Sequence, residues 1–184
     1  MKQSLFPQHD HDHSDCTANL MKFADRYCQQ TGLRLTKLRR MVLEQVAASH
    51  KAIGAYQILD NLQAEGHKLA PISVYRSLDF LQEAGLIHRL ESTNSYFACQ
   101  RNFDEDLDGK NKSLLSRCSK VDPLVFLICE DCGTIGEVEE SSLVNLINSV
   151  ASANHFDVER SQLEIKGTCT SCQNPSIKKS KASS

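Results

Sequence analysis

Residues 71–99, PISVYRSLDFLQEAGLIHRLESTNSYFAC, decide the fold of the first half of the chain. Apolar residues recur at helical spacing after Pro71 and stop before Gly85, which predicts a helix with proline near its first turn and glycine past its end. Two short apolar segments follow, 86–90 and 95–99, separated by turn-forming polar residues, and they predict a β-hairpin. A helix followed directly by such a hairpin is typical of a winged helix.

Three more helices are predicted before this segment. The first begins near Thr17 and is closed by Gly32, and the second has Thr36 as its N-cap. The third begins near Ala55 and stops at Gly66, so that the third and fourth helices form a helix-turn-helix. The N-terminal half therefore predicts a winged helix-turn-helix domain, spanning residues 16–100.

The second half has a different pattern. Short strands are expected at 124–128, 135–138 and 163–165, with one helix at 141–153, so residues 124–174 predict a small α/β domain and the whole chain an α+β protein. Three polar segments complete the division: a disordered tail at 1–15, in which His9, His11 and His13 alternate with aspartates, a hinge or loop at 101–123, and a disordered basic tail at 175–184.

Two CxxC pairs carry the strongest chemical signal. Each pair can present two thiolates on one side of a tight turn, and two pairs supply the closed tetrahedral set of a structural zinc ion. Gly133 directly after the first pair permits the sharp bend that such a turn needs. Since 36 residues separate the pairs, a subdomain must fold between them. The four predicted ligands of the structural zinc are Cys129, Cys132, Cys169 and Cys172.

Two other classes of protein could use the same cysteines. A thiol redox enzyme would need a CxxC that opens a helix in a βαβ unit, and the sequence has no such pattern and no paired acid and base beside a CxxC, so we expect no enzyme. A zinc-ribbon adaptor for other proteins would not bind DNA. Zinc content, dithiol turnover and salt-dependent DNA binding separate these alternatives.

Charge is distributed unevenly along the chain. The net charge is −2, but residues 20–101 carry 11 Lys+Arg against 7 Asp+Glu, whereas residues 102–184 carry 9 against 13. A positive half beside a negative half fits a DNA-reading domain joined to one that does not touch DNA. In the fourth helix the candidate DNA contacts are Ser73, Tyr75, Arg76 and Ser77, and a second basic cluster at the second helix includes Arg34 and Arg39.

Targeting signals are also informative. No apolar segment approaches the ~18 residues of a membrane span, and the first 15 residues lack the apolar core of a secretory signal. We therefore expect a cytoplasmic protein without a membrane partner. In a reducing compartment, eight cysteines are more often metal ligands or thiols than disulfides.

Assembled, these motifs resemble the ferric uptake regulator family, and within it the zinc uptake regulators. The similarity extends from about residue 20 to residue 172. It is carried by LRLT at 33–36 with Arg39, by APISVYRSLDFL at 70–81, by GLIH at 85–88, by ESTNSY at 91–96, and by the two segments CEDCG at 129–133 and GTCTSC at 167–172.

The resemblance implies a homodimeric repressor of zinc-uptake genes that binds palindromic double-stranded DNA when loaded with zinc. It implies one structural and one regulatory Zn²⁺ per subunit, a dimerisation role for the α/β domain, and base contacts by Tyr56 and Arg76. The regulatory ligands carry over as His88, Cys99 and Glu137, a donor set that suits zinc better than iron or manganese.

The sequence departs from the family pattern at the fourth regulatory ligand. Zinc regulators usually have a histidine about seven residues before the first CxxC, and here that position is Asp122. Cys118 and a histidine of the N-terminal tail are the other candidates. A regulator that senses iron, manganese or peroxide is the alternative within the family, although such sensors would favour His and Asp over Cys99.

Overall fold

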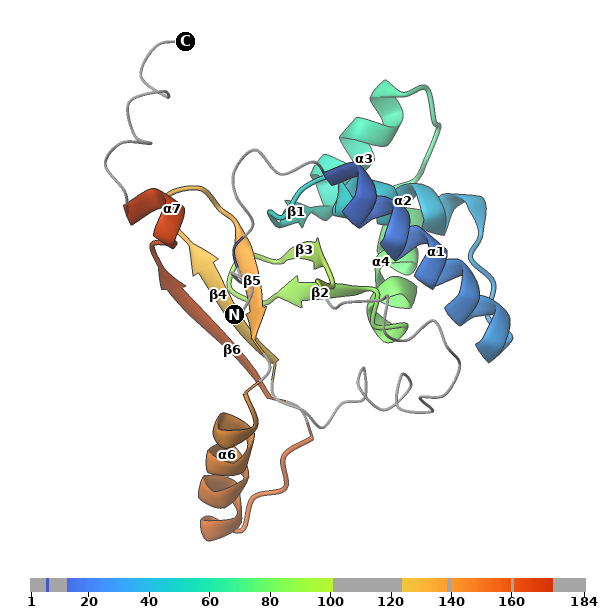
Figure 1. The fold of residues 1–184 in the computed structure, drawn as a ribbon. Coiled ribbons are helices and arrows are strands. Elements are labelled where there is room, and N and C mark those ends of the chain that lie inside the picture. Colours follow the sequence, from blue (N-terminus) through green and yellow to red (C-terminus); the bar gives the residue numbers. More distant parts are fainter. Residues whose placement is uncertain (1–5, 7–12, 101–123, 139, 160, 174–184) are drawn as a thin grey trace. The chain divides into compact units, whose positions relative to one another are not determined.

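A computed structural model describes residue 6 and residues 13–100, 124–138, 140–159 and 161–173 (Figure 1). The described residues form two compact units. Residues 13–100 make the first, which we call the winged-helix unit, and residues 124–173 together with Phe6 make the second, which we call the C-terminal unit. Within the described ranges no helix combines the length and the apolar character needed to cross a membrane.

The winged-helix unit is built from four helices and a small sheet. The helices are α1 (His13–Thr31), α2 (Lys37–Ala47), α3 (Ala55–Ala64) and α4 (Pro71–Glu83). The hairpin consists of β2 (Ile87–Leu90) and β3 (Ser95–Ala98), and β1 (Ile53–Gly54) pairs with the outer edge of β3, which gives the strand order β1-β3-β2. The predicted winged helix is thus confirmed.

Local chemistry explains where these helices begin and end. The hydroxyl of Thr36 accepts a hydrogen bond from the backbone N–H of Arg39, as expected of an N-cap. Pro71 occupies the first turn of α4. Gly32, Gly66 and Gly85 have positive φ after α1, α3 and α4, a conformation that side chains larger than hydrogen disfavour.

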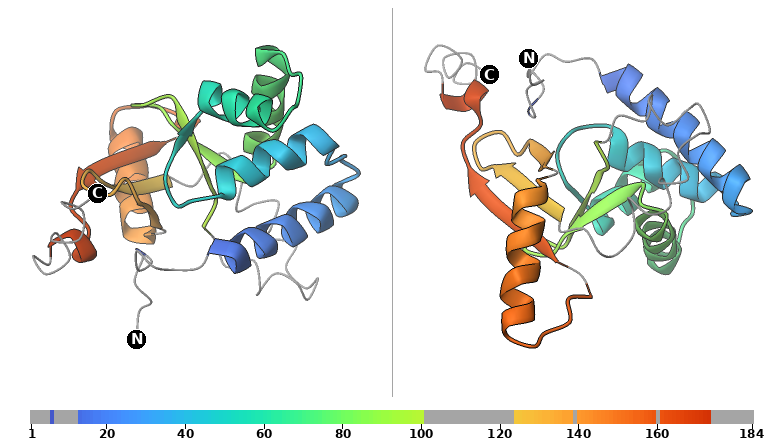
Figure 2. Two further views of the ribbon diagram at one scale, coloured as in Figure 1. Left: turned by 90° about the horizontal axis from the view of Figure 1, so that it is seen from above. Right: turned by 60° about the horizontal axis from the view of Figure 1, so that its bottom comes forward.

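Apolar faces of all four helices meet in one core. Helix α2 packs against α1, α3 and α4, and Figure 2 shows α1 and α2 lying side by side. The most deeply buried side chains of these helices are at most 1% exposed: Ala24, Val42, Leu43, Val46, Ile58, Leu62, Val74, Leu78 and Leu81. This unit therefore has a complete hydrophobic core of its own.

The C-terminal unit is a three-stranded sheet with two helices. Strand β4 (Leu124–Cys129) lies in the centre, antiparallel to β5 (Ile135–Val138) and parallel to β6 (Gln162–Gly167). Helix α6 (Ser141–Ala153) forms the crossover between β5 and β6, and the single turn α7 (Thr170–Gln173) follows β6. Within this unit, α6 and α7 lie at opposite ends of the sheet (Figure 1).

Two parts of the predicted N-terminal tail are ordered. Helix α1 begins at His13 rather than near Thr17, and Phe6 packs in the C-terminal unit. The prediction of a disordered segment at 1–15 was therefore wrong for these residues. The predicted hinge at 101–123 and the basic tail at 175–184 lie outside the described residues.

Candidate metal centre and nucleic-acid surface

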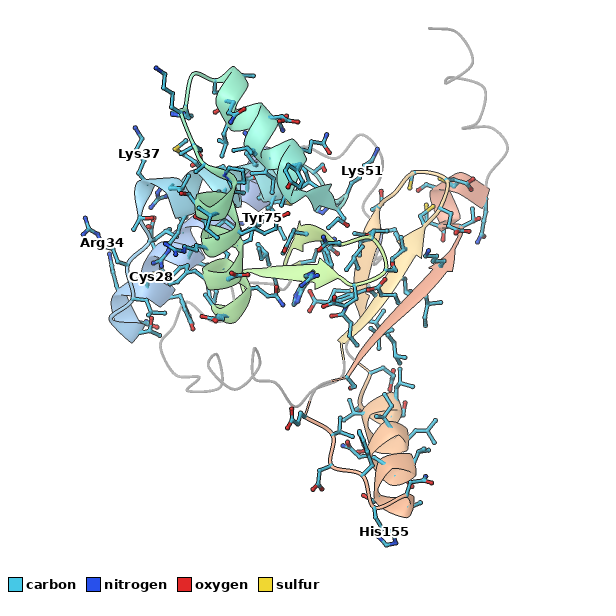
Figure 3. The ribbon with its side chains drawn as sticks, turned by 180° about the vertical axis from the view of Figure 1, so that it is seen from behind. Cys28, Arg34, Lys37, Lys51, Tyr75 and His155 are labelled. Carbon is cyan, nitrogen blue, oxygen red and sulfur yellow. The ribbon has the colours of Figure 1, made fainter. Side chains whose placement is uncertain are left out.

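The parallel pairing of β4 and β6 brings the two CxxC motifs together. Cys129 is the last residue of β4 and is paired with Gly167 at the end of β6, two residues before Cys169. The four predicted sulfur ligands, Cys129, Cys132, Cys169 and Cys172, lie within 4.8 Å of one another. Figure 3 shows sulfur atoms gathered at this end of the sheet, beside α7.

The spacing of the sulfurs fits a tetrahedral metal ion. Four ligands at ~2.3 Å from zinc stand about 3.8 Å from one another. The sulfurs of Cys132 and Cys169 are 3.8 Å apart. A disulfide would need about 2.05 Å, so these two cysteines are not oxidised to each other. The geometry thus favours a shared metal over a disulfide.

Backbone geometry builds each cysteine turn. Gly133 has φ +75° and donates its N–H to the carbonyl of Cys129, while the N–H of Cys129 bonds to the carbonyl of Thr134. In the second turn the N–H of Cys172 bonds to the carbonyl of Cys169. The four sulfurs of the two turns converge within 4.8 Å. The positive φ of Gly133 is the sharp bend that the sequence predicted after the first CxxC pair.

Protonation of the sulfurs reflects their crowding. Burial alone would raise the pKa of the Cys129 thiol, but hydrogen bonds to its sulfur from the N–H groups of Cys169 and Cys132 outweigh burial and lower the pKa to about 6. Burial, together with hydrogen bonding to the other sulfurs, raises the pKa of Cys172 to about 12. A metal cation at this point would favour the thiolate forms of its sulfur ligands and offset the repulsion between them.

Burial also bears on the redox alternative. Cys129, Cys132 and Cys169 are 1%, 5% and 6% exposed, and only Cys172 is partly accessible. A catalytic dithiol would need a reactive sulfur that a disulfide substrate can reach, and it would use one CxxC rather than two converging on one point. The arrangement has the properties of a closed structural metal site.

Phe6 covers part of this site, and sequence reasoning missed it. Its ring packs, half-buried, against the cluster of Cys129, Cys132 and Cys169, as does Cys172. Phe6 and its neighbour Leu5 stand in an otherwise mostly polar segment and give no periodic signal, so the sequence offered no means of finding this contact. An apolar cover limits the access of water and of competing ligands to a metal site.

A second pair of soft donors lies in the wing. His88 on β2 faces Phe97 on β3, with 5.4 Å between their ring centroids, and Cys99 follows β3. A ring nitrogen of His88 and the Cys99 sulfur lie within 4.8 Å of each other, and the two residues are only 8% and 4% exposed. The N–H of Cys99 bonds to the carbonyl of Leu86, which fixes the end of the hairpin.

Glu137 belongs to the other unit. It lies on β5 opposite the fully buried Phe126 of β4 and is itself half-buried. Asp122, Cys118, His9 and His11 lie outside the described residues.

The predicted DNA-contacting residues divide into three groups. Tyr56 at the start of α3 is 66% exposed, and its ring meets that of Tyr75 on α4 edge to face, at 6.4 Å between centroids. Arg76 and Arg34 are exposed, whereas Ser73 and Arg39 are half-buried. Ser77 is 4% exposed and bonds through its hydroxyl to the carbonyl of Ser73, so it faces the core and we remove it from the proposed DNA contacts.

A winged helix with exposed aromatic and basic residues at its helix-turn-helix, joined to a sheet that carries four converging cysteines, defines a class of two-unit metal-binding proteins. The model of the Ferric uptake regulator family matches residues 30–166, and the chain belongs to this family.

The comparisons with individual proteins point to one branch. The zinc uptake regulation protein of Escherichia coli is 31% identical over 156 residues, which is 85% of this chain and 82% of that protein. Among solved structures, a zinc uptake regulator complexed with zinc and DNA aligns with a TM-score of 0.71 at 31% identity, over 85% of this chain and 95% of that one. The holo form of XcZur aligns with a TM-score of 0.68 at 33% identity, over 83% and 96% of the two chains.

Replacement of Cys132 by serine should abolish the four-sulfur site. A serine hydroxyl stays protonated and is a poor zinc ligand, so we expect loss of the bound metal and unfolding of the C-terminal unit, measured by metal analysis and circular dichroism. Cys16→Ser, at an exposed cysteine of α1, should keep both. A Cys132→Ser protein with wild-type zinc content and stability would contradict the assignment.

Truncation of Phe6 should uncover the metal site without removing a ligand. We expect Phe6→Ala to bind zinc but to lose it several-fold faster to an excess of a chromogenic chelator, because competing ligands reach the sulfurs more easily. The control is Phe156→Ala, at a phenylalanine of the same unit that is 67% exposed. Equal rates of zinc loss in Phe6→Ala and in the wild type would show that Phe6 shields nothing.

Proposed function

We propose that this protein is a zinc-responsive transcriptional repressor that binds palindromic operators as a homodimer and controls zinc-uptake genes in the cytoplasm. The observation that carries the proposal is the buried pair of His88 and Cys99 in the wing of a DNA-binding fold, a second donor set whose residues are all different from those of the four-cysteine site. The similarity to a regulator solved with both zinc and DNA supports it.

Helix α4 is the proposed recognition helix. In helix-turn-helix proteins the N-terminal residues of this helix reach base edges in the major groove. Arg76 is exposed near that end and can form a bidentate contact with guanine, and Tyr56 stands exposed on the neighbouring helix. At the start of α4, Pro71 has no N–H and the N–H of Ser73 donates to the carbonyl of Ala70, so the hydroxyl of Ser73 is the proposed phosphate donor of the first turn.

The proposed regulatory zinc has ligands from both units. His88 and Cys99 supply nitrogen and sulfur from the wing, Glu137 supplies oxygen from β5, and the fourth ligand is Asp122, with Cys118 and an N-terminal histidine as alternatives. The metal would act as an electrophilic centre that holds these donors together. A buried thiolate favours zinc over iron or manganese, which distinguishes this proposal from an iron, manganese or peroxide sensor.

Shared ligation gives a physical route from metal to DNA. Ligands that come from two units restrain their relative motion, and a palindromic operator accepts only one spacing of two recognition helices. Zinc then shifts the population toward the conformer that fits DNA, and DNA in turn tightens zinc binding. A hundredfold effect requires a coupling free energy of about 2.7 kcal/mol.

The C-terminal unit is the proposed dimerisation surface. Helix α6 has a regular apolar stripe, yet in the described part of the chain none of its residues is fully buried, and Leu146 and Val150 are 59% and 57% exposed. On the edge strand β6, Leu163 and Ile165 are 37% and 49% exposed. A second copy of the chain that covers these side chains would bury them and would place two recognition helices in one complex.

Substitution of Arg76 tests the recognition helix. We expect Arg76→Ala to weaken binding to a duplex enriched by the wild-type protein from a random pool by ~1–3 kcal/mol, while binding to unselected DNA changes less. Lys22→Ala on α1 removes the same charge from an exposed position outside the proposed interface. Both affinities can be measured by fluorescence anisotropy with zinc present; equal losses in the two variants would leave Arg76 without a specific role.

Substitution of Cys99 tests the sensor. Cys99→Ser should keep the structural zinc and the fold but should no longer gain DNA affinity when buffered free zinc is raised. Cys28→Ser is the matched control, because Cys28 is buried to the same degree in the same unit and is no proposed ligand. A zinc response in Cys99→Ser as large as in the wild type would remove this site from the mechanism.

A further inference from the structure

Four basic side chains are clustered where α2 begins, but they are used differently. Arg34 and Lys37 are exposed and point away from the body of the winged-helix unit (Figure 3). Arg40 forms an ion pair with Asp25 of α1, and Arg39 is half-buried. Only the first two are therefore available to a phosphate backbone without breaking a contact within the fold.

The guanidinium group of Arg39 contacts an aromatic ring on its face and donates a hydrogen bond from its edge. Its central carbon lies 3.4 Å from the centroid of the Phe80 ring on α4, within the range of a cation–π contact. One of its terminal nitrogens donates a hydrogen bond of 2.6 Å to the backbone carbonyl of Arg34. The backbone N–H of Arg39 also donates to the hydroxyl of Thr36. One residue of α2 thus contacts the recognition helix and both ends of the segment 34–36.

We propose that Arg39 is a positioning residue for DNA binding: it holds the segment 34–36 against α4, so that Arg34 meets a DNA phosphate in register with the recognition helix. This inference rests on the proposed DNA-binding function. It differs from the expectation from sequence, in which Arg39 itself was a DNA contact.

The planar shape of the guanidinium is what this role requires. The Phe80 ring and the carbonyl of Arg34 together suit a flat group that contacts an aromatic face and donates from its edge at the same time. A lysine ammonium carries the same charge but has no plane to stack and no fixed fork of donors. Charge and shape can therefore be separated by substitution.

Arg39→Lys keeps the charge and removes the shape. We expect Arg39→Lys to weaken binding of the enriched duplex nearly tenfold at 0.1 M salt, because that is the electrostatic contribution of one phosphate contact. Arg39→Gln, which removes the charge as well, should weaken binding by about the same factor. The slope of log K against log salt should fall by about 0.9 although the net charge is unchanged. A residue that served only as a charge would give a wild-type slope with lysine.

Substitutions at Phe80 and Arg34, the two residues that the Arg39 guanidinium contacts, test whether Arg39 acts through them. Phe80→Leu, which removes the ring, should reproduce the loss of Arg39→Lys, whereas Phe80→Tyr, which keeps the ring, should bind as the wild type does. In an Arg34→Ala background, Arg39→Lys should cause almost no further loss, since two residues that act through one contact are not additive. Circular dichroism of each variant checks that the helices are retained.

The outcomes separate this inference from the function on which it rests. Wild-type affinity and salt slope in Arg39→Lys, or an undiminished loss in the Arg34→Ala background, would overturn the positioning role while leaving DNA binding intact. If the wild-type protein enriched no duplex from the random pool in the presence of zinc, the proposed function would itself be wrong.

Discussion

Four sulfurs held within 4.8 Å at one end of a small sheet are the constraint on which the C-terminal unit depends. The parallel strands β4 and β6 end side by side there, and their crossover helix α6 contributes no buried residue. Among the described residues of this unit other than the cysteines, the deeply buried apolar side chains are Val125, Phe126 and Ile135. A core of this size is too small to stabilise a domain alone, so metal ligation supplies free energy of folding that the winged-helix unit obtains from its own core.

Helical periodicity predicted the elements well wherever both the pattern and the core were local. Helices α3 and α4 begin and end close to the predicted positions and bury the apolar residues that recur at helical spacing, among them Ile58, Leu62, Leu78 and Leu81. Strand β1 was missed because two residues carry no period, and it exists only through pairing with Tyr96 and Ser95, more than 40 positions away. Periodicity also predicted helix α6 with the observed bounds, but not that Leu146 and Val150 of its apolar stripe remain 59% and 57% exposed.

At the candidate sites, the spacing of residues along the sequence predicted which of them come together, but the direction in which a side chain points was predicted less well. The CxxC pairs predicted one cluster, and the structure brings those four residues together. Ser77 was misplaced, although it follows Val74 by three residues and precedes Leu81 by four, so the same periodicity puts it on the inward face. The role of Arg39 could not be predicted, because it depends on Phe80, which is 41 residues away and on another helix.

The position of the second cysteine pair has a consequence for synthesis of the protein on the ribosome. A chain emerges from its N-terminus, and domains fold as they appear. The described helices and strands of the winged-helix unit precede residue 100, whereas Cys169 and Cys172 follow it by about 70 residues and come after every strand of the C-terminal unit that the structure describes. The nascent polypeptide therefore displays a finished winged-helix fold while Cys129 and Cys132 still lack their partners, and those two thiols must stay reduced until Cys169 and Cys172 have been synthesised.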